Sequence, residues 1–300
     1  MSNTDLTFPS ETRPPRLCRL LGGDWLGNLS IVVLVILAIV AVFAPLLAPQ
    51  DANDQSLTNR LAPPVFWAGE GSFDYPLGTD GLGRDILSRL IVGARLTLTV
   101  GLSAAAIATV IGVTLGILAG TKGGWIDAVI MRTADIQMGF PTVLMILLVI
   151  LVFGSSPTTL IFAIGLNVWM FFTRLFRNET CRIVNEPYVA AARVTGMPGL
   201  ALTARHVLPQ LRGMIATVYL MEVPKAILSA AALSFLGIGI TPPHVSWGLM
   251  IGDSQTFVSI AAWPAVFPGI AIAITVMALY MFASWAEPRL DPLRRRSKAS

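Results

Sequence analysis

Charged residues are scarce in this chain. Asp, Glu, Lys and Arg make up 13% of its 300 residues and hydrophobic residues 54%, whereas soluble domains carry about 25% charged residues. The mean hydropathy is correspondingly high, at +0.71. This shortage of charge excludes an ordinary soluble domain and indicates that most of the chain lies in a membrane.

Residues that perform catalysis or bind metals are also rare. The chain has only two histidines, His206 and His244, and two cysteines, Cys18 and Cys181. No metal-ligand spacing joins the histidines, and neither has an evident Ser or Cys partner for nucleophilic catalysis. We therefore interpret both as surface histidines and predict no catalytic residue, no metal and no cofactor. Both cysteines fall on the reducing side of the topology derived below, so no disulfide is expected.

The sequence also lacks a phosphate-binding loop. The segment 116–124 reads GILAGTKGG, which fails the G-x-x-x-x-G-K-[ST] spacing. If ATP drives this protein, another chain has to bind it. The sequence pI is near 9.4, but no run of Lys and Arg is interleaved with aromatic residues, so we predict no nucleic-acid partner. Internal repeats are absent as well, so a two-fold symmetric pathway would require a second chain.

Long charge-free runs are what the sequence has in abundance. A helix needs about 20 apolar residues to cross a bilayer. One long run, 136–173, is interrupted by the turn signal Gly154-Ser155-Ser156-Pro157 and divides into two spans. The other runs are 29–48, 96–121, 213–240 and 263–286. The sequence therefore predicts an all-α membrane protein with six transmembrane helices.

The first run, 29–48, is interpreted as a retained membrane helix rather than a cleaved signal peptide. Its charge-free length exceeds the 7–15 residues of a signal core. Pro49 also stands where a small-residue cleavage site would be needed.

The distribution of Lys and Arg predicts the orientation. With both termini in the cytoplasm, 16 of these cations fall inside, four fall outside, and Lys225 lies within a span. This asymmetry obeys the positive-inside rule. The predicted parts are a cytoplasmic tail (1–28), a first membrane helix (29–48), a periplasmic segment (49–94), a five-helix core (95–289) and a basic cytoplasmic tail (290–300).

Two features of the spans carry hypotheses. Glu222 and Lys225 lie three residues apart in the fifth span, where ionisable side chains are costly and often functional. They either line a polar pathway or neutralise each other as a pair, and the sequence leaves both readings open. Gly112, Gly116 and Gly120 recur every fourth residue in the second span and predict close approach of another helix.

The segment 77–90 predicts a short amphipathic helix at the outer surface, ahead of the second span. Thr79 or Asp80 can cap it, and Asp85 and Arg89 are spaced for an i,i+4 ion pair. Such a helix either seats the following span or contacts an outside partner.

The segment 187–210 interrupts the apolar runs on the cytoplasmic side. Pro187 suits the first turn of a helix, and Gly196 is placed to end that helix in a left-handed conformation. Pro198 can start a second helix, which we expect to stop before Pro209. The alanines between them give a narrow face that can fit a groove on a partner. The alternative reading is a mere connector between spans.

These residues resemble a known family. Ala191-Ala192, followed by Gly196 and Leu208-Pro209, is similar to the EAA loop of binding-protein-dependent ATP-binding-cassette importer permeases. Ala190 departs from the family pattern because it stands where a glutamate is usual. Similarity to the dipeptide/oligopeptide/nickel branch extends along nearly the whole chain, through the segments 76–95, 233–248, 263–269 and 290–292.

The resemblance implies a type I importer permease of the bacterial inner membrane, with six helices and a five-helix core. Its implied partners are a homologous second permease, two cytoplasmic ATPase subunits, a periplasmic solute-binding protein and membrane lipid. Di- or oligopeptides are the implied solutes, with nickel chelates, glutathione or another small solute as alternatives. A secondary transporter is the distant alternative, and the shortage of charges within the membrane counts against it.

The resemblance also implies which residues couple this chain to the ATPase, within the loop 177–212. They are Glu186, Tyr188, Ala190, Ala191, Ala192, Gly196, Arg205, His206, Leu208 and Pro209.

Overall fold

The computed structural model describes residues 24–66 and 71–290. Within these ranges the regular structure is helical, apart from one isolated bridge between Thr79 and Asp85. The predictions for residues 1–23 and 291–300, including Cys18 and most of the basic tail, lie outside the described residues. The all-helical prediction is confirmed.

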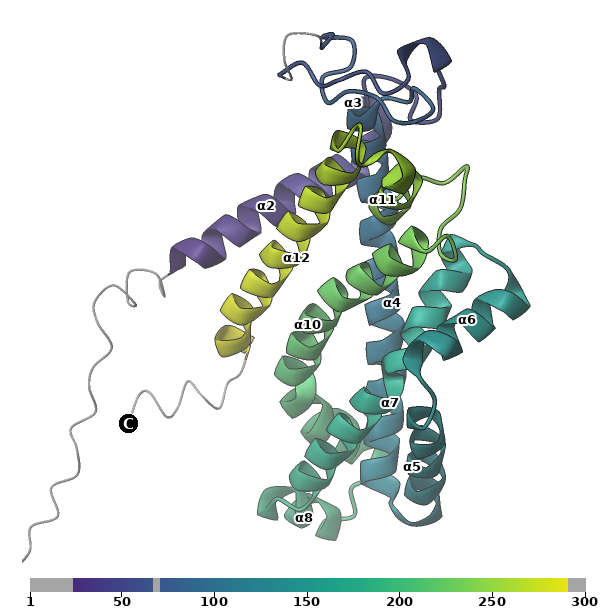
Figure 1. Cartoon of the computed structure of the whole chain (residues 1–300). Coiled ribbons are helices and arrows are strands. Elements are labelled where there is room, and N and C mark those ends of the chain that lie inside the picture. The colour runs from purple at the N-terminus through teal and green to yellow at the C-terminus, as the bar shows by residue number, and fades with distance from the viewer. Residues whose placement is uncertain (1–23, 67–70, 291–300) are drawn as a thin grey trace, which may run out of the picture.

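The elements form an elongated bundle (Figure 1). In chain order they are α2 (Asp24–Val42), α3 (Ala44–Leu47), η1 (Leu57–Asn59), α4 (Ile86–Lys122), α5 (Gly124–Met138), α6 (Thr142–Phe153), α7 (Pro157–Val184), α8 (Pro187–Val194), α9 (Gly199–Leu202), η2 (Thr203–Val207), α10 (Leu208–Phe235), α11 (Trp247–Ser254), η3 (Gln255–Phe257) and α12 (Trp263–Leu290). The end of the bundle that carries α8 lies opposite the end that carries α3 and α11 (Figure 1). We call these the α8 end and the α11 end.

Five helices of the described chain are long and apolar enough to cross a membrane, and the count reaches six if α5 and α6 form one bent span. The two meet at 93° across a break of a few residues. Gly139 and Pro141 stand at this break and end the helical pattern. The turn predicted after this span is present. Gly154 has a φ of +81°, and Ser156 Oγ caps α7 by accepting a hydrogen bond from Thr159 N at 3.0 Å.

The second span starts earlier than predicted, and the separate amphipathic helix over 77–90 is absent. Asp85 rather than Thr79 or Asp80 is the N-cap, since its carboxylate accepts a hydrogen bond from Ser88 N at 2.8 Å. Helix α4 then runs without a break from Ile86 into the membrane. The residue pattern of an amphipathic first turn is the same whether the helix ends at the membrane surface or continues into a span. The pattern alone therefore placed the start of the second span too late.

Helices α4 and α7 are in direct contact along a stripe of glycines. A Cβ atom added at Gly116 would lie 2.7 Å from Phe176 Cβ and 2.8 Å from Thr173 O. One at Gly120 would lie 2.7 Å from Thr180 Cβ, and Gly112 faces α7 in the same way. Any side chain on this stripe would push the two helices apart, so the glycines set their distance.

Gly116→Ala should destabilise the protein, because the added methyl group has no room between α4 and α7. Overpacking of this kind costs about 1–3 kcal/mol. Gly269→Ala in α12 is the matched control, since nothing lies within 4 Å of its added Cβ. We expect it to be neutral or slightly stabilising, because alanine favours a helix over glycine by up to about 1 kcal/mol. Thermal unfolding in detergent measures both, and equal melting temperatures would contradict the contact.

Candidate functional site

The α8 end carries a compact helix–glycine–helix unit, residues 187–202, which we call the elbow. Helix α8 ends at Val194, and Gly196 follows with a φ of +83°. Gly196 N donates to Arg193 O at 3.0 Å and Met197 N to Ala192 O at 3.3 Å. These bonds satisfy the last carbonyl groups of α8. The left-handed turn expected at Gly196 is present, and it reverses the chain into α9.

The elbow is anchored to the spans by apolar side chains. Val189 of α8, Leu202 of α9 and Val207 of η2 are buried in one cluster with Ile183 of α7 and Leu211 of α10. Burial of one such side chain contributes about 1.5–3 kcal/mol. The elbow is therefore held against the ends of α7 and α10 by buried apolar side chains.

The second helix of the elbow was predicted to stop before Pro209, and this prediction is wrong. It continues through the π-helical turn η2 into α10, and Pro209 lies in the first turn of α10. A proline ring normally clashes with the carbonyl group four residues earlier. The wider π turn at 203–207 accommodates it, so the elbow joins the fifth span as one continuous rod, 199–235.

The outer face of the elbow is apolar. Val194 is 88% exposed and Leu200 86% exposed, and the two flank the glycine turn. Large apolar side chains that are exposed together are typical of contact surfaces. Neither residue is among the predicted loop residues, which follow the family motif. Their signal was apolar side chains on either side of Gly196 in a segment outside the apolar runs.

The structure distributes the predicted loop residues over two groups. Glu186, Ala192 and His206 are half-buried. The exposed ones are Tyr188, Ala190, Ala191, Gly196, Arg205, Leu208 and Pro209. The exposed group, together with Val194 and Leu200, is the part of the elbow and of the following turn that is open to a partner.

Several polar members of this loop contact one another. Glu186 pairs with Arg182 at 3.2 Å. Gln210 Nε2 donates to the Tyr188 hydroxyl oxygen, and the Tyr188 ring lies 5.9 Å from that of His206. Partial desolvation of this exposed side chain and the neighbouring Glu186 carboxylate raise the pKa of Tyr188 above its ordinary value. These side chains brace the loop.

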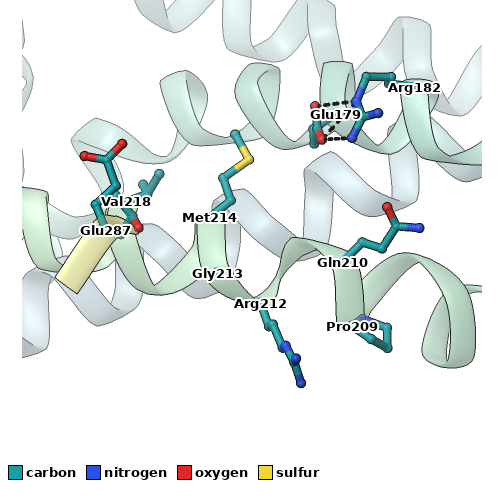
Figure 2. Close-up of a pocket in the computed structure, with 10 residues that line it drawn as sticks. Glu179, Arg182, Pro209, Gln210, Arg212, Gly213, Met214, Val218 and Glu287 are labelled. Carbon is teal, nitrogen blue, oxygen red and sulfur yellow. Dashed lines mark hydrogen bonds and ion pairs between the residues drawn. The ribbon is translucent and has the colours of Figure 1, made fainter. Parts of the chain in front are cut away.

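A cavity of about 490 Å³ lies beside the elbow, between α7, α10 and α12. Figure 2 shows the hydrogen-bonded pair of Glu179 and Arg182 at one side of it, with Met214 and Gln210 on α10 and Glu287 on α12. Arg182 Nη2 lies 2.6 Å from Glu179 Oε1. The lining is mixed in charge and contains no nucleophile paired with a base. Among residues 24–66 and 71–290, no group of three His, Cys, Asp or Glu side chains is placed to hold a metal ion.

Glu222 and Lys225 form an ion pair in α10, with Lys225 Nζ 3.3 Å from Glu222 Oε2. The two partners have very different surroundings. The Glu222 side chain is 6% exposed and the Lys225 side chain 58% exposed. The pair therefore neutralises the buried carboxylate while presenting an ammonium group on the surface of a span.

The α11 end is held by four charged side chains, which we call the charge clamp: Asp80, Arg84, Arg89 and Asp253. Asp80 Oδ2 lies 2.7 Å from Arg84 Nε and 3.6 Å from Arg89 Nε. Asp253 Oδ2 lies 3.0 Å from Arg84 Nη2 and 3.4 Å from Arg89 Nη2. The expected Asp85–Arg89 pair is wrong, since Asp85 is engaged in capping α4. The charge clamp ties the segment before α4 to the end of α11.

Comparison with known proteins gives two family matches along the chain. The family described as "Binding-protein-dependent transport system inner membrane component" matches residues 112–296. A second family, the "N-terminal TM domain of oligopeptide transport permease C", matches residues 24–64.

Individual relatives are similar over nearly the full length. A dipeptide transport system permease protein of Alkalihalophilus pseudofirmus is 36% identical, over 89% of this chain and 86% of the relative. Its counterpart in Bacillus subtilis is also 36% identical, over 96% of this chain and 88% of the relative. A glutathione transport system permease protein of Pectobacterium atrosepticum is 36% identical, over 87% and 84%.

Proposed function

Because the chain belongs to the binding-protein-dependent transport system inner membrane components, we propose that it carries short peptides across the bacterial inner membrane and is driven through its elbow. It is the permease subunit of an ATP-driven importer. Relatives named for dipeptides, oligopeptides and glutathione all handle short peptides or peptide-like solutes. That shared chemistry supports the solute class.

The observation that carries the coupling role is the rigid, apolar-faced elbow. Val194 and Leu200 are exposed on it, while Val189 and Leu202 anchor it to the bundle. A partner that grips this face can move α7 and α10 with it. The proposed partner is the ATPase, and the exposed loop residues Ala190, Ala191 and Gly196 belong to the same contact.

The orientation proposed for this importer places the α8 end in the cytoplasm. Lys122, Arg132, Arg193, Arg205 and Arg212 lie on the elements that meet there. Cations flanking the spans favour the cytoplasmic side. The α11 end then faces the periplasm, where the solute-binding protein is proposed to dock.

We propose that the Lys225 face of α10 lines the pathway. An ammonium group 58% exposed on a membrane span is costly if it faces lipid. Water or a second permease subunit removes that cost. The proposed second subunit therefore packs beside this face, and the two chains enclose the route between them.

Reconstitution tests the function. Liposomes that contain this chain, a second permease, the ATPase and the binding protein should take up a labelled dipeptide only when ATP is supplied. This chain alone should show no uptake, because it has no phosphate-binding loop. Uptake by this chain alone, driven by an ion gradient, would falsify the importer proposal in favour of a secondary transporter.

Gly196→Val should weaken docking of the ATPase. A β-branched residue in the left-handed region is strained by about 1–3 kcal/mol, and open space around Gly196 means that backbone strain is the only cost. We expect about a tenfold or greater loss of ATPase affinity, measured by co-purification. Gly196→Asn is the matched control, since asparagine tolerates this conformation. Equal docking by Gly196→Val and the unmodified chain would show that the turn is not required.

Lys225→Cys should react with a membrane-impermeant thiol reagent in the assembled importer, in a chain whose Cys18 and Cys181 are replaced by serine. Met277→Cys in α12 is the control, because Met277 is 62% exposed but carries no charge. A thiol that faces hydrocarbon stays protonated and unreactive. Equal labelling at both positions, or none at Lys225→Cys, contradicts the pathway assignment.

A further inference from the structure

A groove of about 690 Å³ separates the last turns of α4 from the elbow. We call it the α4 groove. Thr114, Ile117 and Leu118 line it from α4, and Met197 and Leu200 line it from the elbow. Its volume falls within the roughly 300–1,000 Å³ typical of small-molecule sites. It lies on a different face of α4 from the glycine stripe, which is covered by α7.

The floor of the α4 groove consists of exposed apolar side chains. Leu118 of α4 is 40% exposed. Leu200, which also belongs to the face proposed for the ATPase, borders the α4 groove from the elbow. The floor belongs partly to a membrane-spanning helix, which ends at Lys122. The α4 groove therefore extends from the apolar zone of the bilayer to its polar boundary.

The mouth of the α4 groove is cationic. Lys122, the last residue of α4, and Arg193, in the last turn of α8, both line it and are both exposed. No carboxylate lines the groove. In the part of the chain that the structure describes, neither cation has an ion-pair partner. The site thus combines an apolar floor with two unneutralised positive charges.

We propose that the α4 groove binds an anionic phospholipid, with an acyl chain along the floor and the phosphate group between Lys122 and Arg193. Basic pockets between membrane helices on the cytoplasmic side favour anionic headgroups. A free anion would leave the apolar floor uncovered. A zwitterionic lipid would bring a cationic group beside its phosphate and so no net negative charge to balance Lys122 and Arg193. The bound lipid links α4 to the elbow, so bilayer composition stabilises the position of the elbow.

Lipid titration of the assembled importer in neutral detergent tests this proposal, with native mass spectrometry counting bound lipids. Phosphatidylglycerol should bind at least about tenfold more tightly than phosphatidylcholine with the same acyl chains, since each cation near an anionic headgroup contributes about fivefold. Lys122→Gln and Arg193→Gln should each weaken phosphatidylglycerol binding by about fivefold.

Arg132→Gln is the matched charge control. Arg132 is an exposed cation of α5 at the same end of the bundle and does not line the α4 groove. Its removal should leave phosphatidylglycerol binding unchanged. An equal loss in this variant would show that general surface charge binds the lipid, and would overturn the site.

A second pair of variants tests the floor. Thr114→Trp fills the α4 groove and should abolish the preference for phosphatidylglycerol without changing the melting temperature, because Thr114 is exposed. Thr99→Trp, at an exposed threonine elsewhere on α4, should retain the preference. Both threonines bond the carbonyl group four residues earlier, so the two changes disturb the helix alike.

Three other outcomes overturn the proposal. Equal binding of phosphatidylglycerol and phosphatidylcholine would mean unspecific lipid around the bundle. Competition by inorganic phosphate alone at the same concentrations would mean a free-anion site. Loss of the lipid whenever the ATPase is bound would mean that the α4 groove belongs to the protein interface.

Discussion

The close approach of α4 and α7 is the contact on which the rest of the molecule depends. Gly112, Gly116 and Gly120 leave no side chain between the two backbones along that stripe. Gly120 lies against Thr180, in the last part of α7, and α8 starts shortly after α7 ends. The glycine stripe fixes where α7 ends, and the end of α7 in turn fixes where the elbow begins. A lipid environment offers little hydrophobic drive between helices, so close packing of this kind has to supply the association.

Much of this fold could be predicted from apolar runs and turn residues, and the failures share one cause. A bilayer requires long apolar helices, so the spans could be recognised from the sequence. Gly154 and Gly196 marked turns that the structure contains. The start of α4 and the continuation past Pro209 were misplaced, because each depends on local geometry that composition does not record. Asp85 selects the helix start by capping Ser88, and a π turn makes Pro209 tolerable.

The helix–glycine–helix geometry of the candidate site could be predicted from the sequence, whereas its exposed apolar side chains could not. Motif similarity pointed to this loop as the candidate site, and the turn at Gly196 follows from the freedom of glycine. Val194 and Leu200 escaped notice because exposure results from how α8 and α9 pack on the spans, through Val189 and Leu202. The departure from the family pattern at Ala190 lies on the exposed side of α8. Because Ala190 is exposed, this departure leaves the internal packing of the elbow intact.

The charge clamp has a consequence for how the chain is made. Arg84 and Arg89 meet Asp253 across sequence separations of 169 and 164 residues. Membrane helices enter the bilayer in the order of their synthesis, so α4 is inserted long before Asp253 emerges from the ribosome. Until then Asp80 alone balances two arginines, and Arg89 cannot be buried at a neutral site. The ion pairs of the α11 end are therefore completed late, when α10 and α11 have followed and Asp253 reaches Arg84 and Arg89.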